Sequence, residues 1–229
     1  MISLKILRFL AKLLFVLCLP VLLLTVTIAG IANSQWLYQY GFEKYQVSRT
    51  TGLSATELHR AAAGLIDYFN SGEEYIALTV QKDSQPLELF NEREVAHLKD
   101  VKGLLRLDYR VLLGTFLYTL VYVLLSLFRW RDRRQLARGL VAGGSLTLGL
   151  MLLLGAGILL NFNQIFVQFH LISFANDLWQ LDPTRDYLIM LFPGGFWFDA
   201  FLLGTIAIAV GAVISVGWGV IYSSTSPGL

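Results

Sequence analysis

Hydrophobic residues gather in four long stretches of this chain, and polar residues fill the segments between them. The stretches cover residues 13–32, 111–128, 140–160 and 200–222, and none of them contains a charged side chain. A membrane-spanning helix needs about 20 consecutive apolar residues, so each stretch is long enough to cross a bilayer. The pattern therefore predicts an all-α membrane protein with four transmembrane helices.

Composition supports this fold class and excludes others. Of the 229 residues, 55% are hydrophobic and only 15% are charged, against about 25% charged in ordinary soluble domains. The net charge of +2 is mild, and no glycine-rich phosphate loop or basic patch is present, which argues against nucleic-acid binding. The one cysteine, Cys18, lies inside the first stretch, so neither an internal disulfide nor cysteine chemistry is expected.

Arginines predict the orientation in the membrane. The short segment between the second and third stretches contains Arg129, Arg131, Arg133, Arg134 and Arg138. Such a segment stays in the cytoplasm, which puts both termini there and the segments 33–110 and 161–199 outside. The first stretch is too long for a cleaved signal peptide and is predicted to remain as an anchor. The outer segments hold all three histidines and every acidic residue except Asp132.

The predicted organisation has a small extracytoplasmic α+β cap between helices 1 and 2. In chain order it is a tail and transmembrane helix 1 (1–32), the cap (33–110), helix 2 (111–128), the arginine-rich cytoplasmic loop (129–139), helix 3 (140–160), an extracytoplasmic aromatic-rich loop (161–199), and helix 4 with a tail (200–229).

Within the cap, Ser54 and Glu57 have the spacing of a capping box, and apolar residues recur at helical spacing as far as Phe69. Residues 75–80 then predict a short strand, residues 81–86 a turn and residues 87–90 a partner strand. A second helix is expected to start at Asn91.

This second helix places a histidine on its apolar side. His97 shares that side with Glu94 and Leu98, while Lys99, Lys102 and Arg106 lie opposite. The helix could therefore lie along the membrane surface or lead directly into the second apolar stretch. A histidine packed in the cap and hydrogen-bonded to Glu94 or Asp100 explains this pattern as well as a catalytic group does. His59 lies on a polar edge and is expected at the surface. Three widely spaced histidines make metal binding unlikely, and no cofactor is expected.

The outer loop after the third stretch sets His170 among aromatic residues. These are Phe166, Phe169, Phe174, Trp179, Phe196 and Trp197. Such residues anchor many proteins at the membrane interface. With Asn176, Asp177 and Asp186 between them, they also suit an apolar pocket that carries a few polar groups. Both interpretations remain open at this point.

Two motifs resemble those of the lipoprotein intramolecular transacylase family. They are FNEREVAHLKDV at residues 90–101 and FHLISFANDLWQLDP at residues 169–183, followed by DYLI at 186–189 and FP at 192–193. The resemblance extends over nearly the whole chain, including the four spans and the cap.

The resemblance implies an enzyme of the bacterial cytoplasmic membrane that acts on diacylglyceryl-modified lipoproteins among the membrane lipids. Members move the acyl chain at the glyceryl sn-2 position onto the α-amine of the lipoprotein's N-terminal cysteine. The family histidines match His97 and His170, and Asn91, Glu94, Asp100, Asn176 and Asp186 fall at matched motif positions.

The expected chemistry is general acid–base catalysis by two histidines. We expect His170 to be the base and His97 to be the acid or the stabiliser of the oxyanion, although the order could be reversed. Glu94 or Asp100 would orient His97, and Asn176 would donate to the oxyanion.

Two other functions stay open on sequence alone. One is a lipid or lipoprotein hydrolase in which the same histidines activate water, and the other is a non-catalytic membrane protein that senses lipid. The distance between His97 and His170 discriminates between an enzyme of either kind and a non-catalytic protein. Acid and base must reach one reacting centre, so two imidazoles that converge on one outer-leaflet cavity would favour an enzyme, and a separation above about 12 Å would favour the non-catalytic protein.

Overall fold

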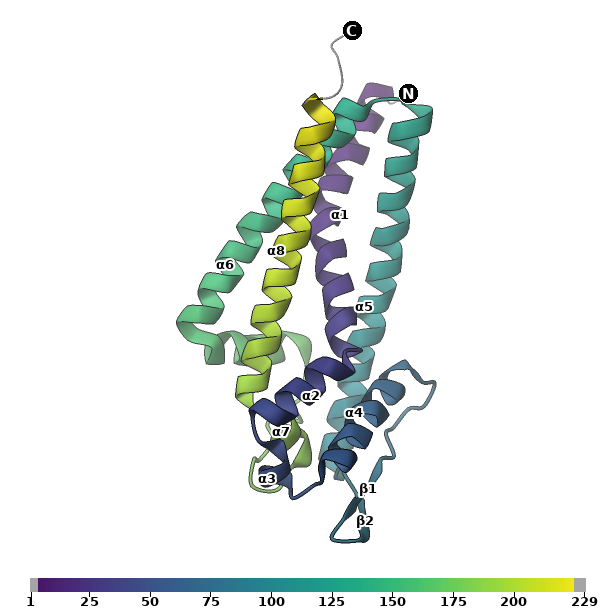
Figure 1. Cartoon of the computed structure of the whole chain (residues 1–229). Coiled ribbons are helices and arrows are strands. Elements are labelled where there is room, and N and C mark those ends of the chain that lie inside the picture. The colour runs from purple at the N-terminus through teal and green to yellow at the C-terminus, as the bar shows by residue number, and fades with distance from the viewer. Residues whose placement is uncertain (1–3, 225–229) are drawn as a thin grey trace. The chain divides into compact units, whose positions relative to one another are not determined.

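The structure is a computed structural model, and it describes residues 4–224. Long helices dominate it (Figure 1). In chain order the elements are α1 (Leu4–Ala32), α2 (Gln35–Lys44), α3 (Val47–Thr51), α4 (Ala55–Asn70), β1 (Thr79–Lys82), β2 (Gln85–Glu88), α5 (Glu92–Leu124), the π-helical turn η1 (Leu125–Arg129), α6 (Arg133–Ser173), α7 (Tyr187–Leu191) and α8 (Gly194–Ser224).

Four of the described helices are long and apolar enough to cross a membrane: α1, α5 with η1, α6 and α8. This confirms the predicted fold class. The helices extend beyond their apolar stretches. The part of α5 before Val111 carries charged residues in every turn, and α6 is kinked at Asn161, just after its apolar stretch ends. We take the apolar stretches as the membrane-spanning segments, so His97 and His170 lie outside them.

The chain forms two compact units. Unit 1 consists of residues 4–29, 108–157 and 203–224, and unit 2 consists of residues 30–107 and 158–202. Unit 1 therefore holds most of the four long helices. Unit 2 holds α2, α3, α4, the β-hairpin and α7, together with the parts of α5 and α6 that carry the two motif histidines.

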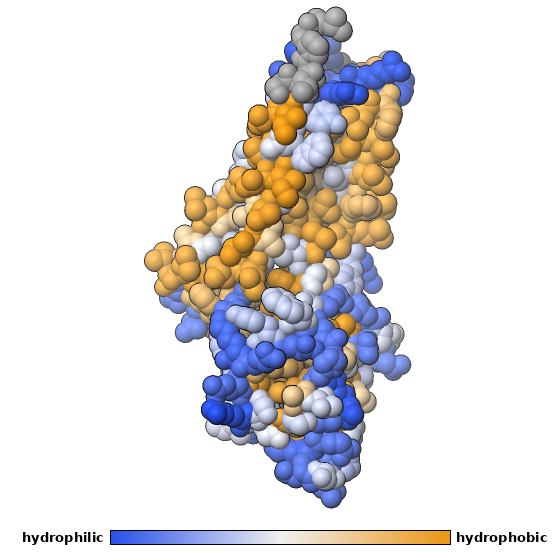
Figure 2. All heavy atoms as spheres, viewed as in Figure 1, coloured by the Kyte–Doolittle hydropathy of each residue, from blue (hydrophilic) through white to orange (hydrophobic). Residues whose placement is uncertain are grey.

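Small residues bring the helices of unit 1 close together. A Cβ atom added at Gly144 of α6 would lie 2.9 Å from the carbonyl oxygen of Ala212 in α8, and one at Gly219 would lie 2.8 Å from that of Ala137. Close helix contacts through glycine are a common way to pack helices in lipid, where no hydrophobic effect drives association. On the face seen in Figure 2, hydrophobic side chains cover most of this unit.

Unit 2 is built around the apolar face of α4. Ser54 caps this helix by accepting a hydrogen bond from the backbone N–H of Glu57 at 3.3 Å, and Leu58 and Leu65 are buried, as the spacing predicts. The second hydrogen bond of a capping box, from the N–H of Ser54 to the Glu57 side chain, is replaced by another contact. The Glu57 carboxylate accepts the N–H of Gln81 in β1 at 2.7 Å. Glu57 therefore joins the helix to the hairpin.

The hairpin differs from the sequence prediction. Its two strands pair antiparallel with Lys82 opposite Gln85, and the turn consists of Asp83 and Ser84 alone. Both turn residues have positive φ, 52° and 61°, as a tight turn of type I′ requires. The strands are therefore displaced from the expected ranges, because Asp and Ser give a weaker turn signal than Asn-Gly or Asp-Gly.

The basic face of α5 packs against the end of α4, and the helix takes the second of the two courses expected from the sequence. Lys102 is 2% exposed, and its Nζ donates to the Ser71 hydroxyl and the Glu73 carbonyl at the end of α4 while lying 4.0 Å above the Tyr68 ring. Lys99 pairs with Glu74 at 2.6 Å. These lysines hold α4 against α5, and the helix runs directly into the second apolar stretch.

Candidate active site

Two buried histidines lie next to each other in unit 2. His97 of α5 is 6% exposed and His170 of α6 is 8% exposed. Their ring centroids are 6.4 Å apart, and the Phe174 ring contacts both. This distance is short enough for both side chains to reach one reacting centre and lies well below the separation of about 12 Å that would favour a non-catalytic protein.

A hydrogen bond determines the tautomer of His170. Its Nδ1 lies 2.7 Å from the carbonyl oxygen of Phe166, one helical turn earlier. A carbonyl oxygen only accepts hydrogen bonds, so in the neutral ring Nδ1 carries the proton. The lone pair of His170 is therefore on Nε2, and this nitrogen can take a proton.

Both histidines are neutral near pH 7. Burial lowers the pKa of His97 to about 4; a protonated His170 and Arg93 act in the same direction, and Asp100 opposes them. Burial also lowers the pKa of His170, although the Phe166 carbonyl favours its charged form. Neutral imidazoles suit a reaction in which one ring accepts a proton and the other donates a hydrogen bond.

Aromatic rings surround His170 more closely than His97. The centroid distances from His170 are 4.3 Å to Phe166, 4.8 Å to Trp179 and 5.3 Å to Phe169. The ring of Trp197 contacts Phe166, with 6.2 Å between the centroids, so Phe166 lies between Trp197 and His170 in this chain of contacts. Phe196 lies elsewhere, 2% exposed in a core cluster of aromatic rings that includes Tyr38 and Phe192.

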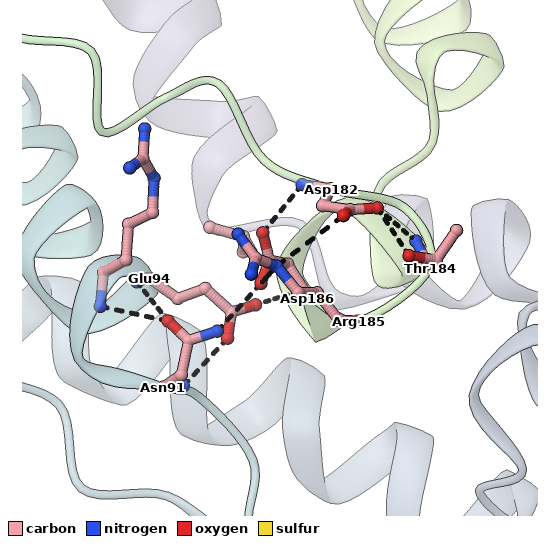
Figure 3. Close-up of polar contacts among 8 residues, drawn as sticks. Asn91, Glu94, Asp182, Thr184, Arg185 and Asp186 are labelled. Atoms are coloured by element: carbon pink, nitrogen blue, oxygen red, sulfur yellow. Dashed lines mark hydrogen bonds and ion pairs between the residues drawn. The ribbon is translucent and has the colours of Figure 1, made fainter.

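Three of the predicted supporting residues form a clamp between α5 and the segment before α7 (Figure 3). The Asn91 amide donates to Asp186 Oδ1 at 2.9 Å, and Asp186 Oδ2 accepts the N–H of Asp182 at 2.7 Å. Glu94 accepts the N–H of Asn91 with one oxygen and the N–H of Leu188 with the other, at 2.8 and 2.6 Å. Glu94 and Asp186 are each 1% exposed. These residues hold segments of the chain together.

A second pair of contacts brackets His97. Four residues before it, Arg93 donates to the carbonyl oxygen of Asp177, and three residues after it, Asp100 accepts the amide of Asn176 at 2.8 Å. The loop that begins at Phe174 is thereby tied to α5 on both sides of His97.

The hydrogen bonds differ from those expected from sequence. Both Glu94 oxygens accept backbone N–H groups, and the Asn176 amide donates one hydrogen bond to Asp100. The roles expected for Glu94 toward His97 and for Asn176 toward an oxyanion stay predictions. His97 Nδ1 is buried without a hydrogen-bond partner among residues 4–224. Arg93 is the residue that sequence reasoning missed. Its position one helical turn before His97 is the signal that points to it.

His59 is exposed, as predicted, and its ring contacts the Gln35 side chain at 3.0 Å. It therefore serves as a control for the other two histidines.

Comparison with known proteins agrees with this geometry. The family model described as lipoprotein intramolecular transacylase Lit matches residues 13–197. The chain belongs to the lipoprotein intramolecular transacylase family. It is a membrane enzyme, and the family acts on lipoproteins.

Solved structures of the Bacillus cereus transacylase share the fold. One structure superposes with a TM-score of 0.82 at 21% identity, covering 97% of this chain and 100% of that one. A histidine-to-arginine variant gives 0.76 at 19% identity, covering 96% and 93%, and a histidine-to-alanine variant gives 0.74 at 19%, covering 96% and 95%. No curated protein sequence matches the chain.

Proposed function

We propose that the enzyme moves the acyl chain at the sn-2 glyceryl position of a diacylglyceryl-cysteine lipoprotein onto the cysteine's own α-amine. The product is the lyso form, with one O-linked and one N-linked chain. The observation that carries the proposal is the pair of buried neutral histidines 6.4 Å apart, in a member of this family.

His170 is the general base of the proposed reaction. The α-amine must lose a proton as its nitrogen bonds to the ester carbonyl carbon, and His170 Nε2 has the lone pair to accept that proton. Collapse of the tetrahedral intermediate then breaks the bond between the carbonyl carbon and the sn-2 oxygen. His97 donates a proton to the departing glyceryl oxygen as its ring receives the proton held by His170, so the proton lost by the amine ends on the glyceryl hydroxyl and both rings return to their neutral state.

The surroundings of His170 fit a lipid substrate. The rings of Phe166, Phe169 and Phe174 contact it, and the next residues in α6 are strongly exposed, Leu171 by 56% and Ile172 by 84%. Exposed apolar groups of this kind contact acyl chains at low cost. A dry site also limits the access of water, which would otherwise compete with the amine for the ester.

Amine and ester belong to one molecule, and this removes the need for an activated acyl donor. Ester-to-amide conversion is downhill, so the enzyme has only to lower the barrier. Holding two groups of one molecule in contact is worth effective molarities of about 10⁵–10⁸ M in well-oriented intramolecular reactions. The proposed location is the extracytoplasmic side of the membrane, where unit 2 would meet lipoproteins in the outer leaflet.

The decisive experiment uses purified enzyme and a diacylglyceryl lipopeptide with a free amine. Transfer leaves the mass of the peptide unchanged, blocks the amine and moves one acyl chain to nitrogen, which fragmentation in a mass spectrometer detects. In a mixture of isotope-labelled and unlabelled substrates, each product should keep its own chain. Label that crosses between molecules would refute the intramolecular route, and loss of one acyl group with a free amine would identify a hydrolase.

Histidine variants connect this activity to the site. His97→Ala and His170→Ala should each reduce the rate by about 10²–10⁴, the usual contribution of general acid–base catalysis. The double variant should lose little more, because the two groups act on one step. The matched control is His59→Ala, at an exposed histidine of the same unit, and it should keep the wild-type rate.

A further inference from the structure

Three buried nitrogen atoms near the histidine pair lack hydrogen-bond partners among the described residues: His97 Nδ1, Arg93 Nε and Trp179 Nε1. Buried donors in folded proteins are almost always paired, so an unpaired one needs an explanation. Four further buried polar atoms without partners within residues 4–224 lie in unit 1, on Asp108, Thr119, Tyr122 and Ser126. The three nitrogens in unit 2 differ from these because they lie at the candidate active site, where a bound substrate would place an acceptor.

Trp179 is the donor that lies against the general base. Its ring packs on His170 at a centroid distance of 4.8 Å and an angle of 33°. The loop that carries it is held by Arg93 through the carbonyl of Asp177 and by Asp100 through Asn176. These contacts position the loop segment just before the indole, and the N–H of such a ring is a donor only.

We infer that Trp179 Nε1–H is the oxyanion donor of the acyl transfer. This inference rests on the proposed function. As the amine nitrogen bonds to the carbonyl carbon, the π electrons of the ester C=O move onto its oxygen, and the N–H stabilises the charge that develops there. When the bond to the sn-2 oxygen breaks, the C=O re-forms as the amide carbonyl. The indole gives up no proton at any stage.

Geometry and charge favour Trp179 over Arg93, and His97 is already assigned to the departing glyceryl oxygen in the proposed reaction. The amine that hands its proton to His170 and the carbonyl that it attacks must lie about 3–3.5 Å apart. A donor to that carbonyl must therefore lie beside His170, where Trp179 does. The guanidinium of Arg93 is engaged by the loop, and its charge next to the base would oppose protonation of His170. A neutral indole stabilises the oxyanion without weakening the base.

The test removes the N–H and keeps the ring. Trp179→Phe keeps an aromatic ring on His170, and replacing Trp179 with 3-benzothienylalanine, whose ring has sulfur in place of N–H, keeps the size as well. Both should lower kcat about 10²–10³-fold with little change in KM, as expected for loss of one oxyanion donor. The control is Trp36→Phe, because Trp36 is an exposed tryptophan of the same unit, 68% exposed. It should react like wild type.

A pH profile separates donation from positioning. If Trp179 only held His170 in place, its loss would shift the pH at which the rate falls in acid. If Trp179 donates to the oxyanion, both variants lower the rate at every pH, and the pH at which the rate falls to half in acid stays the same as in wild type. A benzothienyl variant with kcat within twofold of wild type, or a shifted midpoint, would overturn the inference. Wild-type enzyme that releases free fatty acid would instead refute the proposed function.

Discussion

At the scale of single residues, the most informative feature is the unequal bonding of the two histidines. His170 has its Nδ1 proton placed by the Phe166 carbonyl, while His97 Nδ1 has no partner in the described part of the chain. A ring with a determined tautomer is suited to accept a proton repeatedly at the same nitrogen. A ring without such a bond can turn or exchange its protons as the reaction needs.

The lowered pKa of His97 makes stability depend on pH. Its pKa is about 4 in the folded protein and about 6.5 when unfolded. Between these values the unfolded chain binds the additional proton, so stability should fall as the pH drops from 6.5 to 4. Thermal unfolding in detergent should show a steeper loss over this range for wild type than for His97→Gln. Equal slopes for the two proteins would contradict the lowered pKa.

At the scale of elements, the clamp of Asn91, Glu94 and Asp186 decides where the segment before α7 lies. Its hydrogen bonds join residues that are far apart in the sequence. Glu94 and Leu188 are separated by 94 positions, and Asn91 and Asp186 by 95. Burial raises the pKa of Glu94, whereas the backbone N–H groups of Leu188 and Asn91 favour its charged form. The acid thus acts as an acceptor for two otherwise unpaired backbone groups.

Glu94→Gln should loosen this clamp. An amide nitrogen cannot accept a hydrogen bond, so one buried N–H would lose its partner, at a cost of about 1–3 kcal/mol in unfolding free energy. Hydrogen exchange should accelerate at Leu188 and across residues 182–188, and the transfer rate should fall. Glu92→Gln is the matched control, an exposed glutamate in the same helical turn. If Leu188 exchanged at the wild-type rate in Glu94→Gln, the clamp would have no such role.

Some of these elements follow from local sequence and others do not. The apolar stretches predicted the four long helices, and the spacing around Ser54 predicted α4 and its cap. The strand positions were missed because a turn of Asp83 and Ser84 gives a weak signal. The motif residues pointed to the histidine pair, but the partners of Glu94 and Asn176 depend on contacts between distant segments, which local patterns do not contain.

At the scale of the whole molecule, most of the apolar helix length and the candidate site belong to different compact units. The exposed side chains of unit 1 include many large hydrophobic ones, such as Leu152, Leu153 and Val213. This is the expected surface for helices that face lipid. The charged and polar side chains of unit 2 require water on at least part of its surface.

The arginines between the second and third spans predict the orientation in the membrane. Fusions of alkaline phosphatase at the hairpin turn, near Asp83, should be active because this enzyme folds only outside the cytoplasm. Fusions after Arg138 should be inactive there, since short arginine-rich loops are retained inside. The reverse pattern would place the candidate site in the cytoplasm and remove its access to outer-leaflet lipoproteins.

The ties between α5 and the loop also determine when the enzyme becomes active during its synthesis. Arg93 and Asp100 contact residues 84 and 76 positions later in the chain, and the second and third apolar stretches lie between them. A ribosome that has made only α5 has therefore produced His97 without His170, Trp179 or the loop that holds them. With His170 as the base, as proposed, such a nascent chain lacks the group that would activate the amine. The proposal therefore predicts that the ester lipids around an unfinished copy are protected from its chemistry.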